Sequence, residues 1–174
     1  MKAKFSLCSA AVSASVMMLS LACAHAATIN KANNTDALNL TSSWVGGLVP
    51  GSTDLVNWNS TVTGANTVAL GANATWGGIS VVDPGGAVQI TGAETLTLGN
   101  LGIDLSLATQ DLTIASNLTL GNGGHKWLNA TGRTITLSTG TFTRSATSAL
   151  HLDGLGSVTS TMTGLANTNN ILGP

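Results

Sequence analysis

The chain has 174 residues, of which only 7% are charged, 21 are glycine and none is tyrosine, and its formal net charge is −1. So few Lys, Glu and Arg exclude an ordinary helical bundle, because those residues normally cover helix surfaces. The Thr, Ser and Asn that must form the exterior suit strands and turns, so we expect an all-β protein. The scattered basic residues also argue against a nucleic-acid partner, since binding phosphates requires clustered Lys and Arg.

The first 26 residues have the layout of a secretory signal. Lys2 and Lys4 precede a long uncharged stretch over 5–24, and small residues lie at Ala24 and Ala26. We therefore predict a signal peptide at 1–26, cleavage after Ala26, and a secreted or cell-surface protein without a membrane span in the mature part. An uncleaved membrane anchor is the alternative, which the Ser and Ala content of the stretch weakens.

Both cysteines, Cys8 and Cys23, lie inside this export segment. Cys23 raises a second alternative, a lipoprotein in which it becomes the new N-terminus, although Ser20 occupies the position where such signals usually carry Leu or Val. A mature chain that begins at Ala27 has no Cys. This excludes a disulfide-stapled scaffold and a thiolate metal site.

We divide the rest of the chain into an entry or cap segment at 27–66 and a repeat region at 67–174. Short alternations of apolar and polar residues, separated by Gly, Asn and Asp, run through the second part and show no helical period. Each alternation predicts a strand with one dry and one wet face. The apolar sets are Val68 and Leu70; Val88 and Ile90; Leu96 and Leu98; Ile103, Leu105 and Leu107; Leu112 and Ile114; Leu118 and Leu120; Ile135 and Leu137; Leu150 and Leu152.

The repeat region is similar to itself at a spacing near 20 residues. The run LTLGN at 96–100 recurs at 118–122, 22 residues later, and a related run, TITLSTG, follows at 134–140, with Ile135 lying 17 residues past Leu118. Such spacings match one coil of a parallel β-helix, or β-solenoid. A single coil buries too little to offset its lost entropy, so each coil must be stabilised by its neighbours. A sandwich of antiparallel hairpins is the alternative, with turn signals at Asn122-Gly123 and Asp153-Gly154.

The stretch WVGGLVPGSTDLVNW at 44–58 resembles the opening of proteins that carry autotransporter-associated β-strand repeats. In that family a Trp, a Gly-Pro-Gly turn and an Asp before an apolar-aromatic pair introduce the first coil. The likeness covers most of the chain after residue 40 and continues at ATWGGI (74–79), LTLG (96–99), KWLN (126–129) and GRTITL (132–137). It implies a large bacterial cell-surface or secreted protein with a parallel β-helix passenger of adhesive or structural role.

The chain departs from that family at its end, where ILGP at 171–174 is followed by neither a membrane barrel nor a sorting segment. In similar proteins Ile-Leu-Gly stands in the middle of a domain, so we expect the C-terminus to be truncated. An unpaired strand edge would then be exposed, and edge-to-edge self-association is expected.

The acidic residues are spread singly along the chain, which argues against an enzyme of the polysaccharide lyase or hydrolase type. Paired-carboxylate chemistry needs two acids about 5–10 Å apart. Only stacking of coils would bring Asp83 and Asp104 together, and DPGG at 83–86 is typical of a turn. The acids are Asp36, Asp54, Asp83, Glu94, Asp104, Asp111 and Asp153.

Three further patterns are candidate sites. His151 and Asp153 share a strand face but lack a third ligand or a nucleophile, so exposed polar positions are the better interpretation. The segment 99–104 partly matches the calcium-binding nonapeptide of β-rolls, but as a lone copy with Ser106 where a large apolar residue is required. The glycine-rich run 121–126 lacks the Gly-Lys-Ser/Thr ending of a phosphate loop. We predict no catalytic, cofactor-binding or metal-ligating residue, and no cofactor.

The tryptophans are expected to pack against a cap or the core; the alternative is an exposed row of platforms for sugars. They are Trp44, Trp58, Trp76 and Trp127. Together these patterns predict a non-enzymatic exported segment, a structural or adhesive β-helical passenger whose partners are cell-surface glycans or other surface proteins. The alternative is the N-terminal part of a β-helical polysaccharide lyase or hydrolase whose active site lies beyond Pro174.

Overall fold

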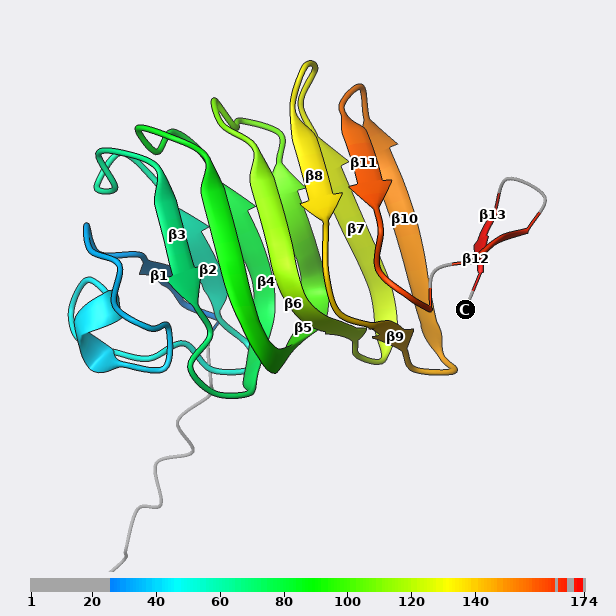
Figure 1. Cartoon of the computed structure of the whole chain (residues 1–174), viewed down its shortest axis with the longest axis horizontal. Coiled ribbons are helices and arrows are strands. Elements are labelled where there is room, and N and C mark those ends of the chain that lie inside the picture. Colours follow the sequence, from blue (N-terminus) through cyan, green and yellow to red (C-terminus); the bar gives the residue numbers. More distant parts are fainter. Residues whose placement is uncertain (1–25, 165, 169–170, 174) are drawn as a thin grey trace, which may run out of the picture.

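The computed structural model describes residues 26–164, 166–168 and 171–173, which form a parallel β-solenoid of about six turns with one short 3-10 helix (Figure 1). The predicted all-β solenoid is confirmed, and the antiparallel sandwich is wrong, because all pairings among β1 to β11 are parallel. The signal peptide expected at 1–26 lies, apart from Ala26, outside the described residues. The elements are β1 (Thr28–Asn30), η1 (Thr41–Ser43), β2 (Leu55–Trp58), β3 (Asn66–Ala69), β4 (Ala74–Val81), β5 (Val88–Leu105), β6 (Leu112–Leu120), β7 (Gly123–Asn129), β8 (Thr134–Leu137), β9 (Phe142–Arg144), β10 (Ser148–Gly154), β11 (Ser157–Ser160), β12 (Ala166–Thr168) and β13 (Ile171–Gly173).

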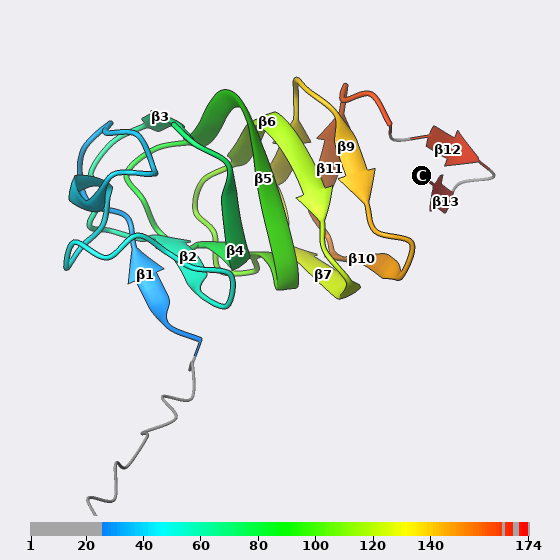
Figure 2. The same ribbon diagram turned by 90° about the horizontal axis from the view of Figure 1, so that it is seen from below.

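The strand segments of the coils stack into three faces of the solenoid, and the four middle coils contribute to all three. Face 1 stacks β1, β2, residues 78–81 of β4, residues 102–105 of β5, β7 and β10. Face 2 stacks β3, residues 88–91 of β5, residues 112–115 of β6, β8 and β11. Face 3 stacks residues 74–76 of β4, residues 95–98 of β5, residues 117–120 of β6, and β9 (Figure 2). A separate antiparallel pair, β12 with β13, follows the last coil.

The 22-residue sequence repeat corresponds to one coil of the solenoid. Leu96 lies directly opposite Leu118, so the 22-residue spacing of the LTLGN runs is one turn. The 17-residue spacing is not a turn. Ile135 lies opposite Leu112 on face 2, whereas the partner of Leu118 on face 3 is Phe142. The TITL run resembles LTLGN because both are half-buried strands, although they belong to different faces.

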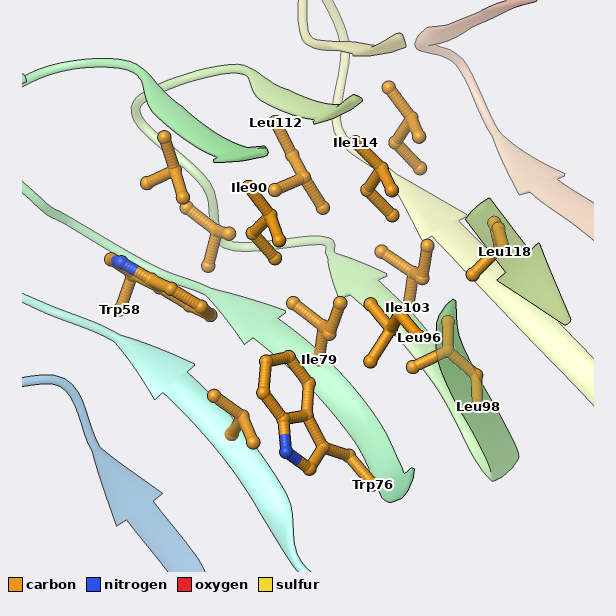
Figure 3. Packing of buried hydrophobic residues seen from close by; sticks show 14 of the residues in the cluster. Trp58, Trp76, Ile79, Ile90, Leu96, Leu98, Ile103, Leu112, Ile114 and Leu118 are labelled. Carbon is orange, nitrogen blue, oxygen red and sulfur yellow. The ribbon is translucent and has the colours of Figure 1, made fainter. Parts of the chain in front are cut away.

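Inward side chains of successive coils lie on top of one another and form one continuous apolar core (Figure 3). Val56, Ile79, Ile103 and Trp127 make one such row on face 1, and Val68, Ile90, Ile114 and Leu137 make another on face 2. These side chains are buried because the alternation of a strand directs every second residue to the same side.

Two leucines expected in the core are exposed instead. Leu107 is 73% exposed because β5 ends at Leu105 and the chain turns there. Leu152 lies opposite the buried Trp127 but is 46% exposed, because it belongs to the last coil, β10 and β11, on which the described residues stack no further coil. Period-2 alternation identifies the side of a strand; burial additionally requires a covering coil.

A cap closes the first end of the core. Residues 27–66, expected as an entry or cap segment, supply this cap and also the first stacked strands, β1 and β2. The Trp44 ring packs edge-on against Trp58 and Trp76, with ring centroids 6.4 and 6.0 Å apart. All four tryptophans are buried, so their predicted packing in cap and core is confirmed. The indole N–H of Trp44 donates to the Leu38 carbonyl at 2.9 Å, which leaves the ring satisfied inside the apolar cap.

Candidate functional site

The carboxylates of three aspartates tie neighbouring coils together. Asp54 accepts a hydrogen bond from the backbone N–H of Ala27 at 3.0 Å, Asp83 accepts from Ser60 at 2.9 Å, and Asp111 accepts from Thr134 at 3.0 Å. Each N–H lies one coil away from its acceptor, at the end of a strand or within two residues of it. These acids therefore satisfy backbone donors of the solenoid.

Asp104 and Asp36 are engaged in local structure. Asp104 accepts from the N–H of Ser106 at 2.8 Å, and Asp36 accepts from the Ser42 hydroxyl at 2.6 Å. The strand partners of Asp104 are Ser80 and Leu128, so stacking does not place Asp83 in register with it. Within residues 26–164, no group of three His, Cys, Asp or Glu side chains is arranged to hold a metal ion.

The predicted His151 and Asp153 positions line an open depression on face 1, of about 420 Å³. Lys126 lies opposite His151 in the register, and its ammonium group forms an ion pair with the Asp153 carboxylate at 2.9 Å. Both side chains of the pair are more than half exposed. Gly124 and Leu152 complete the lining.

The chemistry available at this depression is limited. The hydrogen bond from Lys126, with help from the Gly154 N–H and the positive charge, lowers the pKa of Asp153 below its ordinary value of 3.8. A carboxylate held in its charged form is a poor proton donor near neutral pH. The ion pair is solvated and contributes little to stability. The interpretation of His151 and Asp153 as exposed polar positions agrees with this geometry.

A second histidine, His125, lies on the inner side of the same face and is completely buried. Its Nε2 is 2.9 Å from the Gly121 carbonyl oxygen. Because a carbonyl oxygen only accepts, Nε2 carries the proton, and Nδ1 is left without a partner among the described residues. The imidazole is sealed inside the solenoid, so it is out of reach of a substrate on the surface.

Lys31 is the one described lysine buried in the cap, with no exposed surface. Its ammonium group donates to the carbonyl oxygens of Ala32 and Asn34 at 3.0 and 2.9 Å, and to the side-chain oxygen of Asn34 at 2.7 Å. Burial lowers the pKa of Lys31 from 10.5, and the negative charge of Asp36 offsets part of that shift. All three donors are used, so Lys31 supports the cap and is not available as a nucleophile.

The outer faces differ in chemistry. Face 1 carries Asp104 and the Lys126–Asp153 pair, and the edge of face 2 carries Arg133 beside Asp111, 3.5 Å apart. Face 3 carries Thr and Asn in rows, and a second depression, of about 270 Å³, lies at its last coil, where Phe142, Thr143, Arg144 and Gly164 line it.

Sequence reasoning missed the buried Lys31 and the Lys126–Asp153 pair. No local signal marks either one: the first depends on a loop that supplies three acceptors, and the second depends on a 27-residue separation across one coil. Among the described residues, no helix is long and apolar enough to cross a membrane. No family model, no curated protein and no solved structure matches the chain.

Proposed function

We propose that the chain is a non-enzymatic exported protein segment, a structural and adhesive β-helical passenger at a bacterial cell surface. The observation that carries the proposal is that the aspartate side chains are occupied in structural contacts. Asp54, Asp83 and Asp111 hold coils together, and the exposed Asp153 is neutralised by Lys126. A stacked rod with repeated Thr and Asn rows outside is suited to many weak, equal contacts, whose combined strength exceeds that of any one contact.

Membership of the autotransporter-associated repeat proteins is part of this proposal. It is supported by the placement of the residues that carry the resemblance. Trp44 packs inside the cap, Asp54 closes the turn after Pro50 by accepting from the Gly51 N–H at 2.8 Å, and Trp58 ends β2, the second strand of face 1. A Trp, a turn and an Asp thus lead into β2.

Export is tested at the N-terminus. Expression in a Gram-negative host followed by mass spectrometry of the secreted or surface-exposed protein is expected to give a mature chain that begins at Ala27. A protein that retains its first 26 residues, or one that begins at a lipid-modified Cys23, would contradict cleavage after Ala26.

Adhesion is tested by deletion. Removing residues 27–174 from the protein in its native host is expected to reduce binding of cells to surfaces or to one another, with growth unchanged. Unaltered adhesion of the deletion strain would count heavily against the proposal, provided that the wild-type chain is detected on the cell surface.

A β-helical polysaccharide lyase or hydrolase is the second candidate. The observation in its favour is the depression that brings Lys126, His151 and Asp153 together on an outer face. Incubating the protein with acidic and neutral polysaccharides and measuring new reducing or unsaturated ends separates the two. Product formation that is lost in His151→Ala would refute the adhesive proposal and show that the protein is an enzyme.

A further inference from the structure

Face 3 carries an unbroken row of threonines. Thr75, Thr97, Thr119 and Thr143 lie directly opposite one another on four successive coils. All four point outward, because each is adjacent in its strand to a buried residue: Trp76, Leu96, Leu118 and Phe142 respectively. The row is therefore an array of hydroxyl and methyl groups at the spacing of parallel strands.

A second row runs beside the first, two residues earlier in each strand: Asn73, Thr95, Asn117 and Thr141. Asn73 accepts from the N–H of Thr95 at 2.9 Å. Asn117 links three coils, because it donates to the Ala93 carbonyl at 2.7 Å and accepts from the N–H of Thr141 at 3.0 Å. These bonds fix the positions of the second row relative to the first.

Close packing of the backbones holds the two rows in place. On the other side of the threonine row the strands continue into Gly77, Gly99 and Gly121, which project no side chain. A Cβ at Gly99 would lie 3.2 Å from the Gly77 carbonyl oxygen, and a Cβ at Gly121 would lie 3.2 Å from that of Leu98, so the backbones approach closely there. Within the row, the hydroxyl oxygens of Thr119 and Thr143 are 2.6 Å apart, a hydrogen bond that links these two side chains across neighbouring coils.

This threonine face, defined as the two rows, is also uncharged. Glu94 and Arg144 flank it in the sequence, but none of its eight positions is acidic or basic, in contrast to faces 1 and 2. It also lacks an aromatic platform for a sugar ring, because Trp44, Trp58, Trp76 and Trp127 are all buried. A neutral and regular surface whose backbones are held by hydrogen bonds suits a neutral and regular partner.

We propose that the threonine face binds ice. The backbones of neighbouring threonines repeat at about 4.8 Å, the strand spacing, and the two rows are about 6.6 Å apart, two residues along a strand. Water oxygens on the faces of ice repeat at distances close to both. Threonine hydroxyls then bond to lattice waters while the methyl groups fill the gaps between them, and contacts made in phase over four coils add together. Side chains that are already fixed lose little entropy on binding. This inference goes beyond the proposed function and does not depend on an adhesive role.

The test uses the purified full chain and a pair of variants on one strand. Thr119 lies in the middle of the threonine face, and Thr113, also on β6 and similarly half-buried, points outward on face 2. The wild type is expected to shape growing ice crystals and to inhibit recrystallisation of frozen solutions. Thr119→Lys should raise the protein concentration needed for inhibition by about tenfold or more, because it lifts the face off a flat solid, and Thr113→Lys should leave it unchanged. Circular dichroism melting shows that the variants are folded, and Thr97→Lys replaces Thr119→Lys if that one is not.

A wild-type chain without any effect on ice would overturn the proposal, and so would equal losses in Thr113→Lys and Thr119→Lys. Retention of the chain on crystalline cellulose or chitin with no effect on ice would likewise refute it, and would assign the face to a neutral polysaccharide. None of these outcomes bears on the deletion test of adhesion, so the two proposals fail separately.

Discussion

Replacing Leu118 by Ala tests how much one coil depends on the next. Leu118 is completely buried and lies between Leu96 of the preceding coil and Phe142 of the following coil. Burial of a leucine side chain contributes about 1.5–3 kcal/mol, and the cavity left between two fixed coils adds to that loss. We expect Leu118→Ala to lower the free energy of unfolding by about 3–4 kcal/mol.

Leu152→Ala is the matched control, since Leu152 also points inward but is 46% exposed in the last coil. Less apolar surface is lost there, and the site opens to water, so no enclosed cavity forms. The expected loss is about 1 kcal/mol. Urea unfolding followed by far-UV circular dichroism measures both variants, with midpoints compared at a constant slope. Equal losses, or a loss below about 1 kcal/mol for Leu118→Ala, would refute the stacking argument.

Three further predictions concern the corner glycine, the buried lysine and the exposed end. Gly102→Ala should cost about 2–5 kcal/mol in urea unfolding, because φ is +69° and the new methyl group would meet the Lys126 carbonyl; an unchanged midpoint would contradict this. Lys31 has a lowered pKa in the folded state, so between that pKa and 10.5 the unfolded state binds more protons and stability rises with pH. The stability of wild type relative to Lys31→Met should therefore increase as the pH is raised toward 10.5, and a constant difference would be the contrary result. Residues 27–174 expressed alone should associate with rising concentration in sedimentation experiments, because Leu152 and Leu155 of the last coil are 46% and 83% exposed; a monomer that persists at high concentration would argue otherwise.

The class of fold could be predicted because the sequence shows two periods, one of two residues and one of about a coil. Alternation within a strand follows from burying one side, and the 22-residue repeat of LTLGN follows from stacking equal coils, as the pairing of Leu96 with Leu118 shows. The register at the corners could not be predicted. Ile135 pairs with Leu112, because the bends between faces differ in length from coil to coil.

The environment of single polar residues also could not be predicted from the sequence. A lysine is normally exposed, and Lys31 is buried because one loop supplies three oxygens to its ammonium group. Only part of the threonine face could be predicted from the sequence. Thr97 and Thr119 occupy equal places in the LTLGN runs, whereas Thr75 and Thr143 lie in the unlike segments ATWG and FTRS. Only the pairing of strands aligns all four.

The most direct test of parallel, in-register coils is a cross-link between them. Neighbouring parallel strands place opposite residues about 4.8 Å apart, within the range that a disulfide spans. In a chain with Cys8 and Cys23 replaced by Ser, the pair Thr97→Cys and Thr119→Cys should form an intramolecular disulfide on mild oxidation. The pair Thr97→Cys and Thr113→Cys, on different faces, should not. Cross-linking of the second pair, or of neither, would contradict the solenoid register.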